Sequence, residues 1–169
     1  MAAGATYTPI ASYTVSGSTT ATVTFSSISN AYTDVVCVGN FGSTNAGIVV
    51  GVQLNGDTSS NYSQTRIVGN GTAASSNRYS GTQCYLDSGS YVPLTLTANA
   101  VINIMNYANT TTYKTFLHRY NDAAGETIGG VNLWRATPAA ITSISILLSG
   151  GTGYFLSGST FSLYGIAAA

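Results

Sequence analysis

Charged residues are scarce in this sequence of 169 residues. Five basic and five acidic side chains make up 6% of the chain, against about 25% in an average globular domain. The mass predicts roughly 7,800 Å² of accessible surface, or about one charge per 780 Å², which indicates that protein partners cover much of that surface. Nucleic acids and anionic membranes are excluded as expected partners, because both require clustered Lys and Arg.

Groups that could perform catalysis or bind a metal are equally scarce. The chain has one histidine, His118, and one glutamate, Glu126. No G-x-S-x-G motif accompanies the histidine, so a Ser-His-Asp triad is not indicated. The glycine-rich stretches lack the pattern of a phosphate-binding loop, and Asn55-Gly56-Asp57 lacks the spaced ligands of a calcium loop. We therefore expect a protein that is not an enzyme and that has no cofactor and no metal ion.

Strand-forming and turn-forming residues dominate what remains. The sequence contains 24 Thr, 21 Ser, 19 Gly and 12 Tyr but only 3 Pro. Apolar and polar residues alternate, as in residues 20–25, where Ala21, Val23 and Phe25 share one face. No stretch has the periodicity of an amphipathic helix of ten residues. The expected strands are residues 10–15, 20–25, 34–41, 47–54, 64–68, 78–86, 91–96, 100–107, 112–120, 129–134, 141–148 and 160–166.

About a dozen short strands joined by polar turns predict an all-β fold, an antiparallel β-sandwich that is jelly-roll-like. Residues 72–77 are the most loop-like stretch between the strands. We expect one domain over residues 10–169. Residues 1–9 lack strand alternation and form a candidate N-terminal arm, although a frayed terminus accounts for them equally well.

The chain start and the two cysteines bear on localisation. The first residues lack the basic and apolar parts of a secretory signal peptide, so we expect synthesis in a cytoplasm. Cys37 and Cys84 lie in apolar, strand-like runs without a CxxC motif. A reducing compartment favours two buried, reduced thiols over a disulfide.

Two features suggest surfaces that contact other proteins. The segment from Lys114 to Glu126 holds five of the eleven ionisable side chains, which fits either a charged turn in solvent or ion pairs between subunits. The tyrosines could stack on sugars or line protein interfaces, and the low charge favours interfaces. The candidate interface residues are Tyr7, Lys114, Arg119, Asp122 and Glu126.

Five phrases, in order along nearly the whole domain, resemble a family of small all-β virion structural proteins from tailed bacteriophages. The phrases are TVTFSSISNAYTD (residues 22–34), NGDTSSNYS (55–63), NYANTTTYKT (106–115), LWRATPAAITSI (133–144) and GSTFSLYGI (158–166).

This resemblance implies a component of a virus particle that is made in the host cytoplasm. The leading expectation is a capsid decoration (cement) protein that binds the major capsid protein and stabilises the shell. Jelly rolls at three-fold positions of capsids are commonly trimers, so we expect a homo-oligomer, with a homotrimer as first choice. The alternative is a tail- or fibre-associated module that binds receptor glycans.

Overall fold

The computed structural model describes residues 6–89, 92–122 and 125–167. These residues form twelve strands and no helix. The strands are β1 (Tyr7–Thr14), β2 (Thr22–Phe25), β3 (Asp34–Phe41), β4 (Val49–Leu54), β5 (Tyr62–Gly69), β6 (Ala74–Gly81), β7 (Cys84–Tyr85), β8 (Ala98–Ile104), β9 (Lys114–Asn121), β10 (Thr127–Trp134), β11 (Ile144–Ser149) and β12 (Thr160–Ile166).

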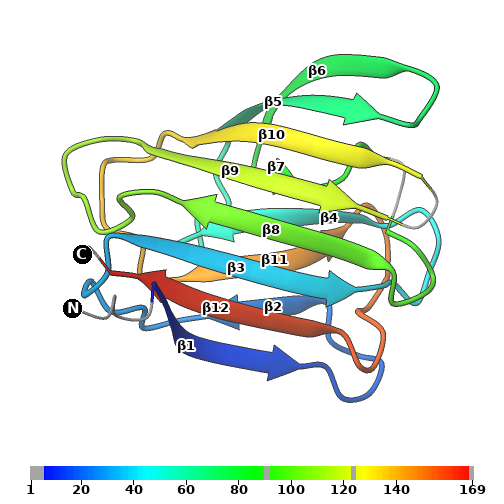
Figure 1. Cartoon of the computed structure of the whole chain (residues 1–169), viewed down its shortest axis with the longest axis horizontal. Helices are drawn as coiled ribbons and strands as arrows, with labels where there is room; N and C mark the ends of the chain where they lie inside the picture. Colours follow the sequence, from blue (N-terminus) through cyan, green and yellow to red (C-terminus); the bar gives the residue numbers. More distant parts are fainter. Residues whose placement is uncertain (1–5, 90–91, 123–124, 168–169) are drawn as a thin grey trace.

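Two antiparallel sheets pack face to face (Figure 1). The large sheet has the strand order β1-β12-β3-β8-β9-β10-β5-β6, and the small sheet has the order β2-β11-β4-β7. Without the hairpins β5–β6 and β9–β10, two four-stranded sheets remain. Each connection between consecutive remaining strands then crosses from one sheet to the other, except that from β4 to β7, which both lie in the small sheet. This arrangement of eight strands is a jelly roll, and the prediction of a jelly-roll-like β-sandwich is confirmed.

The four added strands β9, β10, β5 and β6, which we call the extension, widen only the large sheet. Over the other four strands, β1, β12, β3 and β8, the two sheets enclose an apolar core. Phe41 and Phe161 stack at 5.5 Å between ring centroids, and Phe155 meets both rings edge-on at 5.7 and 5.0 Å. Burial of each such side chain contributes about 1.5–3 kcal/mol to folding.

The inner side of the extension is unusually polar. Gln64 and Arg66 of β5 are buried and face residues 82–89, the segment that contains β7. The Gln64 carboxamide donates to the Tyr85 carbonyl at 3.0 Å and accepts from the Tyr85 amide at 2.6 Å. The Arg66 guanidinium donates to the carbonyls of Asp87 and Ser88. Side chains of the extension therefore hold the covering segment through its backbone groups.

Several expected strand limits differ from the observed ones. Residues 74–77, expected in a loop, form the first half of β6, whose side chains are not buried on either face and so show no apolar alternation. The expected strand at 78–86 is the end of β6, a turn and the short β7. The expected strand at 91–96 is wrong, since residues 92–96 form bends and irregular structure.

The chain start forms part of the fold, and both cysteines are buried. β1 begins at Tyr7, so residues 7–9 pair with β12, while residues 1–5 of the candidate arm lie outside the described residues. Cys37 and Cys84 are free, buried thiols, as expected. Burial raises the pKa of each thiol to about 12, so both stay protonated and unreactive at neutral pH.

Candidate interaction surface

The face of the large sheet that points away from the small sheet, which we call the outer face, has an exposed centre. Its central side chains are apolar and exposed: Ile67 at 63%, Val131 at 54%, and Leu117 and Val38 at 39% each. They come from four different strands of the sheet, β5, β10, β9 and β3. An apolar surface in the middle of a sheet marks a candidate interaction site.

The registers of the strands align these residues in rows across the sheet. One row runs Ser12, Ser162, Val38, Val101, Arg119, Gly129, Ile67, Ser76 from β1 to β6. The next row contains Leu117, Val131 and Thr65 as direct neighbours. On the other side of the first row, Asn40, Asn99 and Asn121 are aligned, and Asn40 donates to Asn99 at 3.0 Å. The outer face is thus an apolar centre beside a row of uncharged amides.

Charge on this face is sparse. In β3, β8, β9, β10 and β5, the outward-facing charged residues are Asp34 and Arg119, while Lys114 and Arg66 point inward and are buried. Arg78 of β6 lies at the border of the face. A partner that covers the centre of this face would have to desolvate one positive charge, that of Arg119, and the cost of burial stays low.

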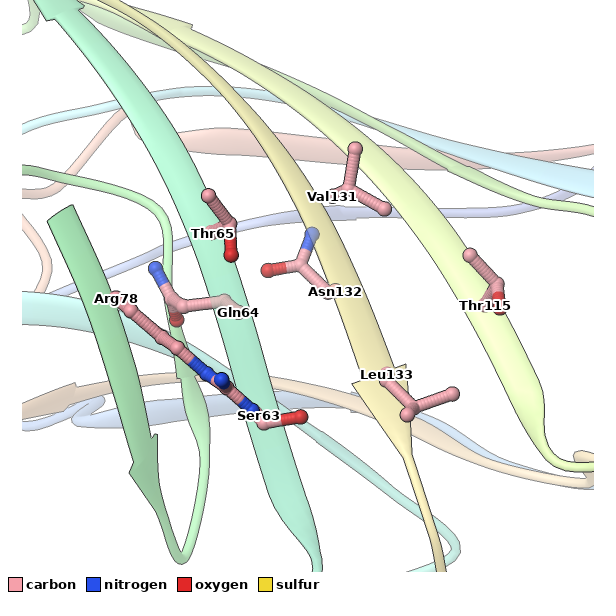
Figure 2. A pocket seen from close by; sticks show the side chains of 8 residues that line it. All are labelled: Ser63, Gln64, Thr65, Arg78, Thr115, Val131, Asn132 and Leu133. Carbon is pink, nitrogen blue, oxygen red and sulfur yellow. The ribbon is translucent and has the colours of Figure 1, made fainter. Parts of the chain in front are cut away.

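The outer face has a hollow at its β1 end, beside Pro9 and Tyr164, and three more over β8, β9, β10 and β5. Among these three, a hollow of about 270 Å³ lies over β5 and β10 and is lined by Ser63, Thr65, Arg78, Thr115 and Leu133, among others (Figure 2). A second, of about 370 Å³, lies beside the asparagine row. The third, of about 400 Å³, surrounds Gly129, where a Cβ atom would meet nothing within 4 Å. Side chains of a partner could enter these hollows.

The five interface residues predicted from the sequence do not form one patch. Lys114 is only 2% exposed, and its ammonium group donates to the carbonyls of Asn109 and Thr112 at 2.5 and 3.1 Å. Asp122 is 8% exposed and accepts from the amides of Gly125 and Glu126. The structure therefore removes both from the candidate interface, because their charges are satisfied inside the chain.

The other three predicted residues remain accessible. Arg119 is exposed at the centre of the outer face. Tyr7 lies at its β1 end, where its ring meets Tyr164 edge-on at 6.2 Å. Glu126 is half-buried and accepts a hydrogen bond from the Ser88 hydroxyl at 2.5 Å. The predicted segment 114–126 thus supplies one residue, Arg119, to the centre of this face.

Some tyrosines are buried and hold backbone segments in place through their hydroxyl groups, and others lie on the surface. Tyr62 and Tyr107 are buried, and their hydroxyls bond to backbone groups of loops. Tyr7, Tyr13 and Tyr113 are exposed and come from β1 and from the loop before β9. They line none of the hollows over the extension.

His118 is a structural residue by its surroundings. It is buried on the inner side of β9, where its Nδ1 lies 2.8 Å from the Asn132 amide nitrogen. Its ring occupies the space that a Cβ of Gly130 would need, which explains the glycine at that position. Burial, with Arg66 nearby, lowers the pKa of His118 to about 4, so the ring is neutral at pH 7 and points away from the outer face.

Asp57 also has a structural role. Burial alone would raise the pKa of Asp57, but three donors hold it below its ordinary value: the Asn61 amide, the Trp134 indole and the Ser59 backbone amide. Within the described residues, no three His, Cys, Asp or Glu side chains are grouped as a metal site would need. Nor does that part of the chain contain a helix long and apolar enough to cross a membrane.

Comparison of the chain with protein-family models, with curated proteins and with solved structures finds no match. The outer face, its geometry and its charge are therefore the features on which a function can be argued.

Sequence reasoning missed the apolar centre of the outer face. A signal was present, because the strand at 34–41 is apolar on both of its faces, with Val38 opposite in direction to Cys37 and Phe41. The strand at 112–120 likewise carries Leu117 on the face opposite to Phe116. Apolar residues on the second face of half-buried strands of one sheet indicate a candidate interaction site.

Proposed function

We propose that this protein is a non-catalytic structural component of a virus particle, a decoration protein that binds the assembled capsid shell through its outer face. The observation that carries the proposal is the apolar, nearly uncharged centre of that face around Val38, Leu117, Val131 and Ile67. The virus particle as the partner rests on the resemblance of five sequence phrases to virion structural proteins. Jelly rolls occur in capsid proteins and also in lectins, so the architecture alone does not distinguish these roles.

The size of the outer face suits a stable protein interface. Eight strands about 4.8 Å apart, each about seven residues long at about 3.4 Å per residue, span about 38 by 24 Å, or about 900 Å². A specific interface buries about 800 Å² on each partner. The outer face alone is therefore large enough to attach the protein to a shell.

The proposed mechanism is burial of flat, uncharged surface. Covering the apolar centre gains about 25 cal/mol per Å² of apolar area removed from water. The hydroxyls and amides around it, such as Thr65, Thr115 and Asn99, can form hydrogen bonds with the partner at the border. Many copies bound in this way would join neighbouring capsid subunits and oppose their separation.

The test uses particles stripped of this protein and purified protein added back. Thr65→Lys places a charge on the outer face, and Thr22→Lys places the same charge on the outward side of the small sheet, where Thr22 is also exposed. We expect Thr65→Lys to weaken binding at least tenfold and Thr22→Lys to leave it unchanged, with both variants folded. Equal binding by the two variants would contradict docking through the outer face.

The number of copies of this protein per particle distinguishes a capsid decoration protein from a tail component. Densitometry of purified particles should show hundreds of copies of a shell decoration protein and tens or fewer of a tail component. A count in the tens would replace the decoration role with the tail-associated one. Binding of purified protein to host surface glycans would then be measured, because such a module acts as a receptor-binding protein.

A further inference from the structure

The two sheets have four edges, and three of them are protected against pairing with another chain. β1 contains Pro9 and a register shift between Pro9 and Ala11. β2 has four residues and β7 has two. Prolines, bulges and short strands hinder the pairing of an edge strand with a strand of another chain. The fourth edge, β6, has eight residues with neither a proline nor a register shift.

Besides its pairing with β5, β6 has two side-chain contacts to the described part of the chain: Asn77 accepts from the Arg66 guanidinium at 2.6 Å, and the centroid of the Tyr79 ring lies 4.6 Å from that of the Tyr85 ring. None of its eight residues is buried. In Figure 1, β6 lies at the end of the large sheet opposite β1, with its far edge unoccupied. Its one charged residue is Arg78. A long, nearly uncharged edge of this kind is a template for a further strand.

The hairpin geometry identifies the backbone groups that face this free edge. The Asn70 amide donates to the Ala73 carbonyl at 3.1 Å, which makes residues 70 and 73 a hydrogen-bonded pair. Because such pairs alternate along an antiparallel ladder, the backbone groups of residues 75, 77 and 79 point to β5. Those of Ala74, Ser76, Arg78 and Ser80 point to the free edge.

We propose that β6 pairs with β6 of a second copy of this chain, antiparallel and about a two-fold axis perpendicular to the sheet. Every copy carries the same donors and acceptors, so antiparallel pairing of the strand with itself satisfies both. With Asn77 opposite Asn77, Ser76 lies opposite Arg78 and Ala74 opposite Ser80, which gives about eight hydrogen bonds. One neighbouring register would place Arg78 opposite Arg78, and repulsion disfavours it. The other would place Ser76 opposite Ser76 and would leave Ser80 outside the ladder, which reduces the number of hydrogen bonds to about six.

The pairing is compatible with docking of the outer face. A two-fold axis perpendicular to the sheet keeps both outer faces on the same side, so the dimer presents one surface of twice the size. A trimer, which is the first choice by analogy with other jelly rolls of capsids, would need contact between unlike edges if it formed by strand pairing. Pairing of β6 with β1 would be interrupted at Pro9 and at the register shift beside it.

The first test removes one edge-facing amide at each end of the large sheet. Ser76→Pro removes such an amide from β6 without removing a bond to β5. Ser12→Pro is the matched control: it lies in the same cross-strand row at the β1 edge, and the bond from the Val15 amide to the Ser159 carbonyl implies that its own amide also points outward. Oligomeric state is measured by sedimentation equilibrium of the full chain, and thermal unfolding checks that both variants fold.

We expect wild-type protein and Ser12→Pro to be dimers at about 100 μM, and Ser76→Pro to dissociate at least about tenfold more readily. A monomeric or trimeric wild-type protein would overturn the proposal, and so would a dimer that Ser76→Pro leaves intact.

A second pair of variants keeps every backbone amide and tests the register. Ser76→Glu places a carboxylate opposite Arg78 of the other copy at two symmetric positions, and Ser76→Lys places an ammonium group there. We expect the dissociation constant to fall about threefold or more with Glu and to rise by a similar factor with Lys at low salt. Equal constants for the two variants would contradict the register with Asn77 on the axis.

Discussion

The two faces of the large sheet are made by the same strands, but the fold requires apolar residues on the inner face only. On β9, Phe116 points inward and is fully buried, whereas its neighbour Leu117 points outward and stays 39% exposed. On β10, Trp134 is buried on the inner side, where its indole donates to Asp57, while Val131 is exposed on the outer side. The inner residues are explained by folding, and the outer apolar residues are not.

The comparison shows that the fold of the monomer does not require apolar side chains at the centre of the outer face. A sheet with one solvated face normally alternates apolar and polar residues, and threonine, which is also a good strand former, would suit the fold at positions 67 and 131. Conversely, the inner side of the extension contains Gln64, Arg66 and His118, which are polar yet buried. Polarity therefore does not distinguish the inner side of this sheet from the outer side.

The largest difference between the faces should appear in stability. Phe116→Ala leaves a cavity in the core and is expected to lower the free energy of unfolding by about 3–5 kcal/mol. Leu117→Ala, one residue away on the outer face, is expected to cost less than about 1 kcal/mol. Urea unfolding of both variants checks this, and similar losses in the two would show that the outer face also supports the fold.

A second prediction concerns the polar region between the extension and its covering segment, where burial shifts the pKa values of two groups, His118 and Asp87, in opposite directions. Burial lowers the pKa of His118 to about 4, so below pH 6.5 the unfolded chain binds a proton that the folded chain does not, and stability falls on acidification. Burial raises the pKa of Asp87 to about 6, despite its bonds to the Val50 and Gly89 amides and the nearby Arg66. Between pH 6 and 4 the folded chain therefore binds a proton that the unfolded chain does not, and stability rises.

Each group alone gives a slope of about 1.4 kcal/mol per pH unit, and the two cancel between pH 6 and 4. We expect His118→Gln to gain stability on acidification relative to wild type, and Asp87→Asn to lose it. The free energy of unfolding in urea at pH 6, 5 and 4 gives both slopes. Parallel pH profiles for wild type and the two variants would show that neither group titrates as its burial implies.

Local alternation predicted much of the fold, and its failures have physical reasons. β3 and β12 have the residue limits predicted for them, because each has a buried face that imposes a period of two. The first half of β6 was missed because this strand buries neither face and hence has no such period. The added hairpins lie in one sheet only, and this assignment depends on pairing between strands distant in the chain, which alternation does not encode.

The candidate site was predicted less well than the fold. Arg119 was identified as an interface residue, but Lys114 and Asp122 were placed there for their charge, and both are buried. Lys114 shares its face of the strand with Phe116 and His118, a pattern that indicates burial. The hydrogen bonds that satisfy it come from the preceding loop, and sequence alone does not reveal the course of that loop.

The smallest expected effect is that of salt on attachment to the particle. If uncharged surface is what docks, raising the salt from about 0.05 to 1 M should change binding less than about threefold, although the Debye length falls to about 3 Å. Sedimentation of particles at both salt concentrations, with this band quantified against the major capsid protein, measures the effect. Release of more than half of the protein from intact capsids at high salt would show that ion pairs are the main contacts with the particle. Arg119 would then be the first candidate for such a pair.

The docking of the outer face can be measured directly with introduced cysteines. Cys37 and Cys84 are buried with a pKa of about 12, so a maleimide reagent should label only an added, exposed thiol. We expect Thr65→Cys on the outer face to be labelled in free protein and protected on the particle, and Thr22→Cys on the small sheet to be labelled in both states. Equal labelling of Thr65→Cys in free and particle-bound protein would contradict the account.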